Sequence, residues 1–204
     1  MCYYGHLKVK IIKGAYIKNC IVLSQKEKES FLNLARKSIE FFLKTKNVPT
    51  FTELNIDLPS IKNERLGVFV TLTKNDDLRG CIGYVQGFKP LFEGIIDNAI
   101  NAAVKDPRFP QVTINEFSDL HIEISILSPL EEVKDINKIK VGTHGLIISK
   151  GLQSGLLLPQ VAVEWNWDLK TFLENTCNKA GLPKDAWKSG AKIQCFTATI
   201  FNEK

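Results

Sequence analysis

Apolar side chains recur at helical spacing in three stretches of the chain. They predict helices over residues 24–44, 90–104 and 168–180. The first stretch opens on a capping box, because Ser24 is followed three positions later by Glu27. We interpret its apolar stripe as a packing surface rather than a cofactor-binding element. Pro90 suits the first turn of the second helix, where a backbone N–H has no partner within the helix.

Alternating or short apolar runs predict strands over residues 67–73, 78–85, 121–128, 145–149, 155–158 and 192–201. A polar stretch, residues 74–77, joins the first two strands into a predicted hairpin. Strands that come mostly in hairpins, with helices between the groups, favour an α+β fold with a largely antiparallel sheet over a doubly wound fold. The order of helices and strands in the first half of the chain is loosely repeated in the second half. We therefore predict two lobes folded as one unit, with a ligand cleft between them.

Prolines mark the connections between these elements. Residues 106–110, Asp-Pro-Arg-Phe-Pro, follow the second predicted helix. Each proline prevents the helix from continuing, and it favours an extended backbone for the residue before it. The sequence therefore predicts a rigid loop here, and a longer connection over residues 47–63, which also contains two prolines.

The positive charge lies at one end of the chain. The 204 residues are 44% apolar and 24% charged, as in an ordinary globular protein, and the formal net charge is +5. No acidic residue precedes Glu27, whereas five lysines do, and the remaining residues have equal numbers of basic and acidic side chains. Because a nucleic-acid groove needs clustered basic side chains within the fold, the charge supports such binding only through the arm from Lys8 to Lys18.

Cysteine and histidine usage limits the chemistry further. Five cysteines without a C-x-x-C pair indicate a reducing compartment. The start of the chain does not resemble a signal sequence and no apolar run is long enough for a bilayer, so we expect a cytoplasmic protein without membrane contact. Motifs of nucleotide hydrolases and zinc peptidases are absent, and the three histidines are not spaced as metal ligands. We therefore expect no cofactor and no metal.

The hexapeptide Leu-Arg-Gly-Cys-Ile-Gly, residues 78–83, carries two glycines in a predicted strand. Glycine weakens a strand unless another group passes close to the backbone. In a strand without a bulge, Arg79 and Cys81 lie on one face, and a guanidinium beside a thiol favours the reactive thiolate. The alternative is that Cys81 is a small buried residue and that Arg79 makes an internal ion pair.

This hexapeptide resembles the signature of the AMMECR family, named for the Alport syndrome, midface hypoplasia and elliptocytosis chromosomal region. Further segments resemble archaeal and bacterial members in order and spacing: residues 106–110, 141–145, 156–168 and 176–187. The resemblance covers about residues 23–201. It implies one domain with two lobes over residues 23–204, preceded by a basic extension over residues 1–22.

The resemblance implies an α+β fold with two unequal lobes, built from a duplicated strand-and-helix unit into one barrel-like sheet. It identifies no reaction. Prokaryotic members resemble components that accompany Memo-type and radical SAM proteins, which makes those proteins candidate partners. The resemblance places Cys81 and His144 in family motifs, and we take them as the candidate catalytic residues. The candidate ligand-binding residues are Arg79, Gly80, Gly83, Asp106, Arg108, Phe109 and Gln160.

Three functions are compatible with these residues. The preferred one is a binding domain, in which a cleft at the hexapeptide, rimmed by Arg79, Arg108 and His144, receives an anionic small molecule or a partner's carboxylate. It would be excluded if both arginines were held in internal ion pairs and pointed away from any cleft. The second is a cysteine-dependent enzyme with Cys81 as nucleophile, His144 as base and Arg79 or backbone N–H groups holding the developing anion. The third is a regulatory factor of nucleic-acid machinery that uses the basic arm.

Two further residues bear on partner binding. Trp165 and Trp167 are separated by one residue, and packing in the core is their commoner role. If the pair is exposed, it indicates a partner or ligand surface.

Overall fold

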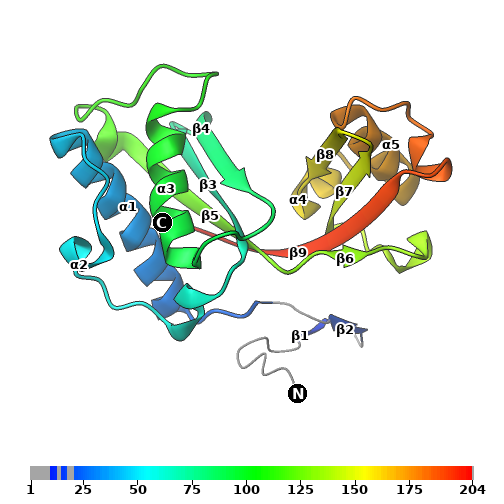
Figure 1. The fold of residues 1–204 in the computed structure, drawn as a ribbon, viewed down its shortest axis with the longest axis horizontal. Coiled ribbons are helices and arrows are strands. Elements are labelled where there is room, and N and C mark those ends of the chain that lie inside the picture. Colours follow the sequence, from blue (N-terminus) through cyan, green and yellow to red (C-terminus); the bar gives the residue numbers. More distant parts are fainter. Residues whose placement is uncertain (1–9, 13–14, 18–20, 204) are drawn as a thin grey trace. The chain divides into compact units, whose positions relative to one another are not determined.

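A computed structural model describes residues 10–12, 15–17 and 21–203 of the chain, with side chains for the last of these ranges. The chain divides into two compact units of unequal size (Figure 1). Unit 1 contains residues 21–127 and the end of the chain from Thr199, and unit 2 contains residues 128–198. Near the N-terminus, β1 (Lys10–Ile12) and β2 (Ala15–Ile17) form a two-stranded sheet. Lys8, Lys13 and Lys18 of the predicted basic arm lie outside the described residues.

Unit 1 is built on an antiparallel sheet with the order β4-β3-β5, and the last residues of β9 lie beside β5. Helices α1 and α3 pack together against one face of this sheet (Figure 1). The strands are β3 (Gly67–Lys74), β4 (Asp77–Tyr84), β5 (Leu120–Leu127) and β9 (Lys192–Asn202). The helices are α1 (Gln25–Thr45), α2 (Phe51–Leu54), η1 (Ser60–Asn63), α3 (Leu91–Val104) and η2 (Phe117–Asp119).

The helix cap and the hairpin turn that the sequence predicts in unit 1 are both present. The capping box at the start of α1 is present, since the Ser24 side chain accepts from the backbone of Glu27 and the Glu27 carboxylate accepts from the backbone of Ser24. Asn75 and Asp76 have φ values of 52° and 67°, the left-handed geometry that a tight two-residue hairpin turn requires. This turn fixes the register at the start of the hairpin, where Lys74 pairs with Asp77 and Thr73 with Leu78.

One face of the unit 1 sheet is apolar and closed, and the other is more accessible. On β3, Val68, Val70 and Leu72 are fully buried in the core with the helices. The side chains between them, Phe69 and Thr71, are only partly buried. The candidate residue Cys81 lies opposite Thr71 in the strand pairing, so it belongs to this second face.

Unit 2 has its own antiparallel sheet and core. Strand β9 pairs with β7 on one side and with the short β6 on the other, and β8 pairs with β7. The elements are β6 (Glu131–Glu132), η3 (Ile136–Lys138), β7 (His144–Lys150), β8 (Gln153–Leu157), α4 (Pro159–Glu164), α5 (Leu169–Lys179) and η4 (Ala186–Lys188). Asp168 caps α5 as predicted, by accepting from the backbone of Thr171. Phe172 and Leu173 are fully buried in this core.

The predicted α+β class with antiparallel strand pairing is confirmed. Two short helices, α2 and α4, are not in the sequence-based prediction. The α2 helix begins with a capping box of its own, formed by Thr50 and Glu53, in a segment where prolines predict only a connection. None of the described helices combines the length and the apolar character needed to cross a bilayer.

Candidate functional site

The hexapeptide forms most of β4, and it contains a β-bulge. Gly80 pairs with Leu72 whereas Leu78 pairs with Thr73, so the register shifts by one residue and Arg79 is the extra residue. A bulge changes the direction of the side chains around it. The prediction of side-chain faces assumed a strand without a bulge. It is wrong for Leu78, which pairs with Thr73 and so lies on the same face as Cys81.

Arg79 makes an internal ion pair. Its Nη2 and Nε donate to the two carboxylate oxygens of Glu116 at 2.8 and 3.3 Å, and its Nη1 donates to the carbonyl of Pro110 at 2.8 Å. The Arg79 side chain is only 13% exposed. The Arg79 guanidinium lowers the pKa of Glu116 to about 2, with smaller contributions from the Thr113 backbone and from Lys74. Arg79 therefore fixes the loop after α3 and has little surface left for a ligand.

Asp106 and Arg108 form a second ion pair, which binds the backbone of Cys81. The Asp106 carboxylate accepts from Arg108 Nε at 2.9 Å, from Arg108 Nη2 at 2.7 Å and from the backbone N–H of Cys81 at 2.8 Å. Arg108 Nη2 also approaches the carbonyl of Cys81 at 3.4 Å. The Asp106 side chain is 1% exposed, and its hydrogen bonds from Arg108 hold its pKa well below the usual range.

This side-chain pair occupies the position of a neighbouring strand. A carboxylate accepts from the N–H of Cys81 and a guanidinium donates to its carbonyl, as the two backbone groups of a paired residue do. Exposed strand edges invite pairing with other chains, and proteins commonly cover them. The spatial link between residues 78–83 and 106–110 explains why both segments belong to one site.

The thiol of Cys81 is partly exposed and has a donor beside it. Thr71 Oγ1 donates to Cys81 Sγ at 3.3 Å across the hairpin. Arg108 lies over the ring of Phe109, with 5.4 Å from its guanidinium carbon to the ring centroid, and its side chain is 54% exposed. We refer to Thr71, Cys81, Asp106 and Arg108 as the signature platform.

Glycine is required at the two positions of the hexapeptide for different structural reasons. A Cβ atom at Gly80 would lie 2.1 Å from the backbone carbonyl oxygen of Ala102, so β4 and α3 pack in direct backbone contact there. A Cβ at Gly83 would lie 2.3 Å from the ring of Phe69, which covers this position. The expectation that glycine marks a close approach to the backbone agrees with both positions.

His144 and Gln160 belong to unit 2, whereas the platform belongs to unit 1. The backbone N–H of Lys140 donates to His144 Nδ1 at 3.2 Å, which leaves the proton of the neutral ring on Nε2. Burial, and to a lesser extent the Lys140 charge, lower the His144 pKa. This arrangement presents a donor rather than a base, and catalysis by Cys81 with His144 stays a prediction that this hydrogen bond disfavours. Gln160 Oε1 is buried and has no hydrogen-bond partner among the described residues.

The tryptophan pair of unit 2 is partly exposed. Trp165 is 69% exposed and stacks on Trp167, with 6.4 Å between ring centroids. Trp167 packs against the unit 2 core. Trp165 is therefore the exposed member of the pair. It belongs to unit 2, whereas the signature platform belongs to unit 1.

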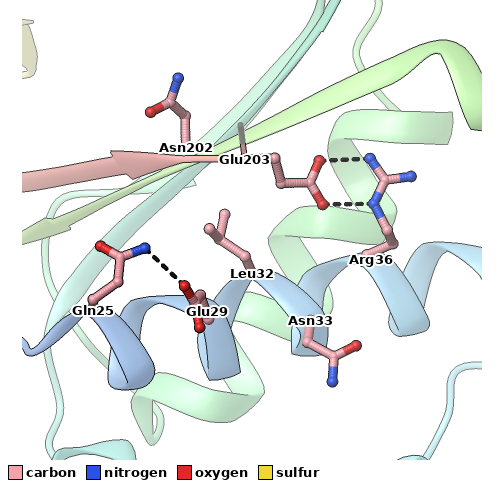
Figure 2. A pocket seen from close by; sticks show the side chains of 7 residues that line it. All are labelled: Gln25, Glu29, Leu32, Asn33, Arg36, Asn202 and Glu203. Carbon is pink, nitrogen blue, oxygen red and sulfur yellow. Dashed lines mark hydrogen bonds and ion pairs between the residues drawn. The ribbon is translucent and has the colours of Figure 1, made fainter.

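A cavity of about 330 Å³ lies in unit 1 between α1 and the end of the chain (Figure 2). Figure 2 shows Arg36 and Glu203 pointing toward each other across it, with two hydrogen bonds of 2.5 Å. Arg36 also donates to the carbonyl of Leu120 at 2.6 Å, and Glu203 accepts from the backbone of Ile122 at 2.9 Å. These contacts fasten the chain end to the sheet, and we interpret the cavity as a by-product of that anchor.

Sequence reasoning missed two residues of the site. The turn at residues 75–76 directs attention to the residues of β3 opposite the hexapeptide, but by itself it pairs Thr71 with Gly80, and only the bulge at Arg79 makes Cys81 the partner. Glu116 had no comparable signal, since its contact with Arg79 joins positions 37 residues apart. Among the described residues, no group of three or more histidine, cysteine or acidic side chains has the arrangement of a metal site.

These features define an α+β protein of two units, in which a glycine-containing strand edge is covered by an aspartate–arginine pair. The chain belongs to the AMMECR1 family, because the model of that family matches residues 32–201. The match includes the platform and both units.

Several archaeal proteins are similar over nearly the whole chain. Protein Mbar_A1807 of Methanosarcina barkeri is 45% identical over 190 residues, which cover 90% of this chain and 93% of that protein. Protein TK0174 of Thermococcus kodakarensis is 46% identical over 187 residues, 86% of this chain and 90% of that protein. The crystal structure of the uncharacterized protein PH0010 from Pyrococcus horikoshii has a TM-score of 0.82 and 44% identity, and the match covers 89% of this chain and 94% of that one.

Proposed function

We propose that this chain is a cytoplasmic binding domain that receives a protein partner at the signature platform. The observation that carries the proposal is the position of Arg108. Asp106 and the Cys81 carbonyl fix the guanidinium, yet the Arg108 side chain is 54% exposed. A side chain held in place before binding loses little conformational entropy when a partner arrives. Free thiols at Cys81, Cys177 and Cys195 agree with a reducing compartment.

The charges around the platform favour a protein partner over a small free anion. Both Arg79 and Arg108 are in internal ion pairs, with Glu116 and Asp106. Arg79 is also largely buried and no longer supports the anionic-ligand hypothesis, whereas Arg108 is half exposed. Since each pair is formally neutral, long-range attraction of a small anion is weak. A partner protein gains additional binding free energy from shape complementarity and from backbone contacts.

The resemblance to components that accompany Memo-type and radical SAM proteins supplies the partners to test. We expect the Memo-type or the radical SAM protein of the same organism to bind the full chain in titration calorimetry. Arg108→Gln should weaken binding about tenfold or more, as truncation of a central arginine does at other interfaces. Arg65→Gln is the matched control, because Arg65 also lies in unit 1 and donates to a backbone carbonyl, that of Phe88.

Circular dichroism of the Arg108→Gln variant separates weaker binding from unfolding. Succinate and inorganic phosphate, titrated in the same way, test the small-ligand alternative. Binding of these anions with loss in Arg108→Gln would replace the protein partner by a small molecule. Absence of binding by both proteins and both anions would overturn the proposal, as would equal binding by the wild type and Arg108→Gln.

A cysteine-dependent reaction at Cys81 is a second candidate, favoured by the hydrogen bond from Thr71 to the partly exposed thiol. A donor to sulfur stabilises the thiolate, which is the reactive form. We expect iodoacetamide to label Cys81 in the folded chain much faster than Cys177, which is fully buried. Thr71→Val should slow the labelling, because it removes the hydrogen bond to the sulfur.

Mass spectrometry of the labelled peptides reads each cysteine separately, so Cys177 serves as an internal control. If Cys81 reacts only when the protein unfolds, it is a structural cysteine and the second candidate fails. The third function, nucleic-acid association through the basic arm, depends on lysines of which Lys8, Lys13 and Lys18 lie outside the described residues.

A further inference from the structure

Strand β4 lies at the end of its sheet. In the strand order of unit 1 it pairs with β3 alone among the described strands. The outer edge of such a strand carries backbone N–H and C=O groups that point away from the sheet. At Cys81 these groups are bound by Asp106 and Arg108, which shows that Cys81 points its backbone outward.

The backbone of Gly83 has the same orientation as that of Cys81, but no side-chain pair binds its outward groups. Backbone direction alternates along a strand, so Gly83, two residues after Cys81, also points its N–H and C=O outward. The pairing supports this, because Cys81 faces Thr71 and Gly83 faces Phe69 without a shift between them. Within residues 21–203, no hydrogen bond to the outward N–H and C=O of Gly83 is found. Gly83 itself is only partly buried.

The surroundings of Gly83 also suit the approach of another backbone. It has no side chain to obstruct the edge, and the ring of Phe69 fills the space above it. Two usual protections of a strand edge, a bulge and charged side chains, occur at Arg79 and at Cys81, and neither occurs at Gly83. Two residues of strand span about 7 Å, so the exposed part of Arg108 is within reach of an acidic side chain beside Gly83.

We propose that this open edge binds an extended, acidic segment of a protein partner, which pairs its backbone with Gly83 and directs a carboxylate to Arg108. This inference rests on the proposed function and names the kind of partner segment that the platform takes. Another backbone is the chemical group that offers a donor and an acceptor at the spacing of a strand residue. The half-exposed arginine beside the edge selects for an acidic segment.

Amide hydrogen exchange of the full chain, followed by NMR, tests the edge directly. In the free protein the amide of Gly83 should exchange about a hundredfold faster than those of Ile82 and Tyr84, which point toward β3. The probe for binding is a phage-displayed library of random dodecapeptides, selected on the full chain and counter-selected on Arg108→Gln. A synthetic copy of a selected peptide should then protect the amide of Gly83.

The selected peptide allows a control that leaves the protein unchanged. Methylation of one peptide nitrogen at a time should reduce affinity about tenfold at alternate positions and little at the positions between, because only alternate residues bond to the edge. Replacement of its acidic residue by the amide should weaken binding to the wild type and leave binding to Arg108→Gln unchanged.

Three results would overturn the edge pairing. The first is slow exchange of Gly83 in the free chain. The second is failure of the library to yield any peptide that prefers the wild type to Arg108→Gln. The third is a peptide that depends on Arg108 but neither protects Gly83 nor responds to alternate methylation, and in that case the proposed function survives although this inference does not.

Discussion

Replacement of Asp106 by alanine is expected to lower the free energy of unfolding by about 3 kcal/mol. The Asp106 carboxylate is almost completely buried and accepts from Arg108 and from the backbone of Cys81. Alanine leaves a buried N–H without a partner and an arginine without its counter-charge. Urea denaturation of wild type and variant, analysed by linear extrapolation, measures the loss.

Asp119→Ala is the matched control for this prediction. Asp119 is 54% exposed and lies 3.7 Å from Lys74, so its removal should cost less than about 0.5 kcal/mol. An equal effect of the two substitutions would mean that water replaces Asp106 at the edge of β4. In that case the ion pair would not be what covers the edge.

The same pair gives the protein a defined response to acid. The pKa of Asp106 is lowered in the folded state, so its stabilisation is complete above the unfolded pKa of about 3.9 and is lost as the pH falls below it. The stability difference between wild type and Asp106→Ala should therefore shrink in acid. Glu116, with a folded pKa of about 2, has the same sign, and its contribution is retained in the Asp106 variant.

Gly80→Ala is expected to destabilise the protein by about 3 kcal/mol or to prevent folding. The new Cβ would lie 2.1 Å from the carbonyl oxygen of Ala102, and this oxygen is backbone, so no side-chain rotation relieves the overlap. Thermal and urea unfolding measure the effect. Leu78→Ala, at a 42% exposed position of the same strand, should cost less than about 1 kcal/mol.

A double variant tests the cause of the Gly80 effect. Gly80→Ala combined with Ala102→Gly removes a methyl group from α3 but leaves its carbonyl oxygen in place. We expect no recovery of stability. Recovery would show that side-chain crowding, rather than contact between the backbones of β4 and α3, makes glycine necessary.

The elements of the fold were largely predictable because their signals are local. The Ser24 capping box, the polar turn at Asn75 and Asp76, and the Asp168 cap each act within a few residues. The isoleucines at alternate positions of β5 identify its buried face for the same reason. In each case the free energy that selects the local structure comes from neighbours in the sequence.

Only part of the candidate site could be predicted from the sequence, and its arrangement could not. The hexapeptide and the loop at residues 106–110 were recognised as candidates, and the structure joins them through Asp106 and Cys81. The bulge at Arg79 was not predictable, because it depends on how β4 meets Glu116 and Pro110, residues far away in the chain. The roles of the two arginines differ for this reason.

The sequence by itself determined the α+β class, most of the helices and strands, and the importance of a strand with two glycines. Only the tertiary structure decided that Arg79 is internal, that Arg108 is half exposed, and that the edge of β4 is covered at Cys81 and open at Gly83. The physical reason is that backbone periodicity is set by neighbouring residues, whereas the partner of a charged side chain or a strand edge is set by segments that meet only when the chain folds.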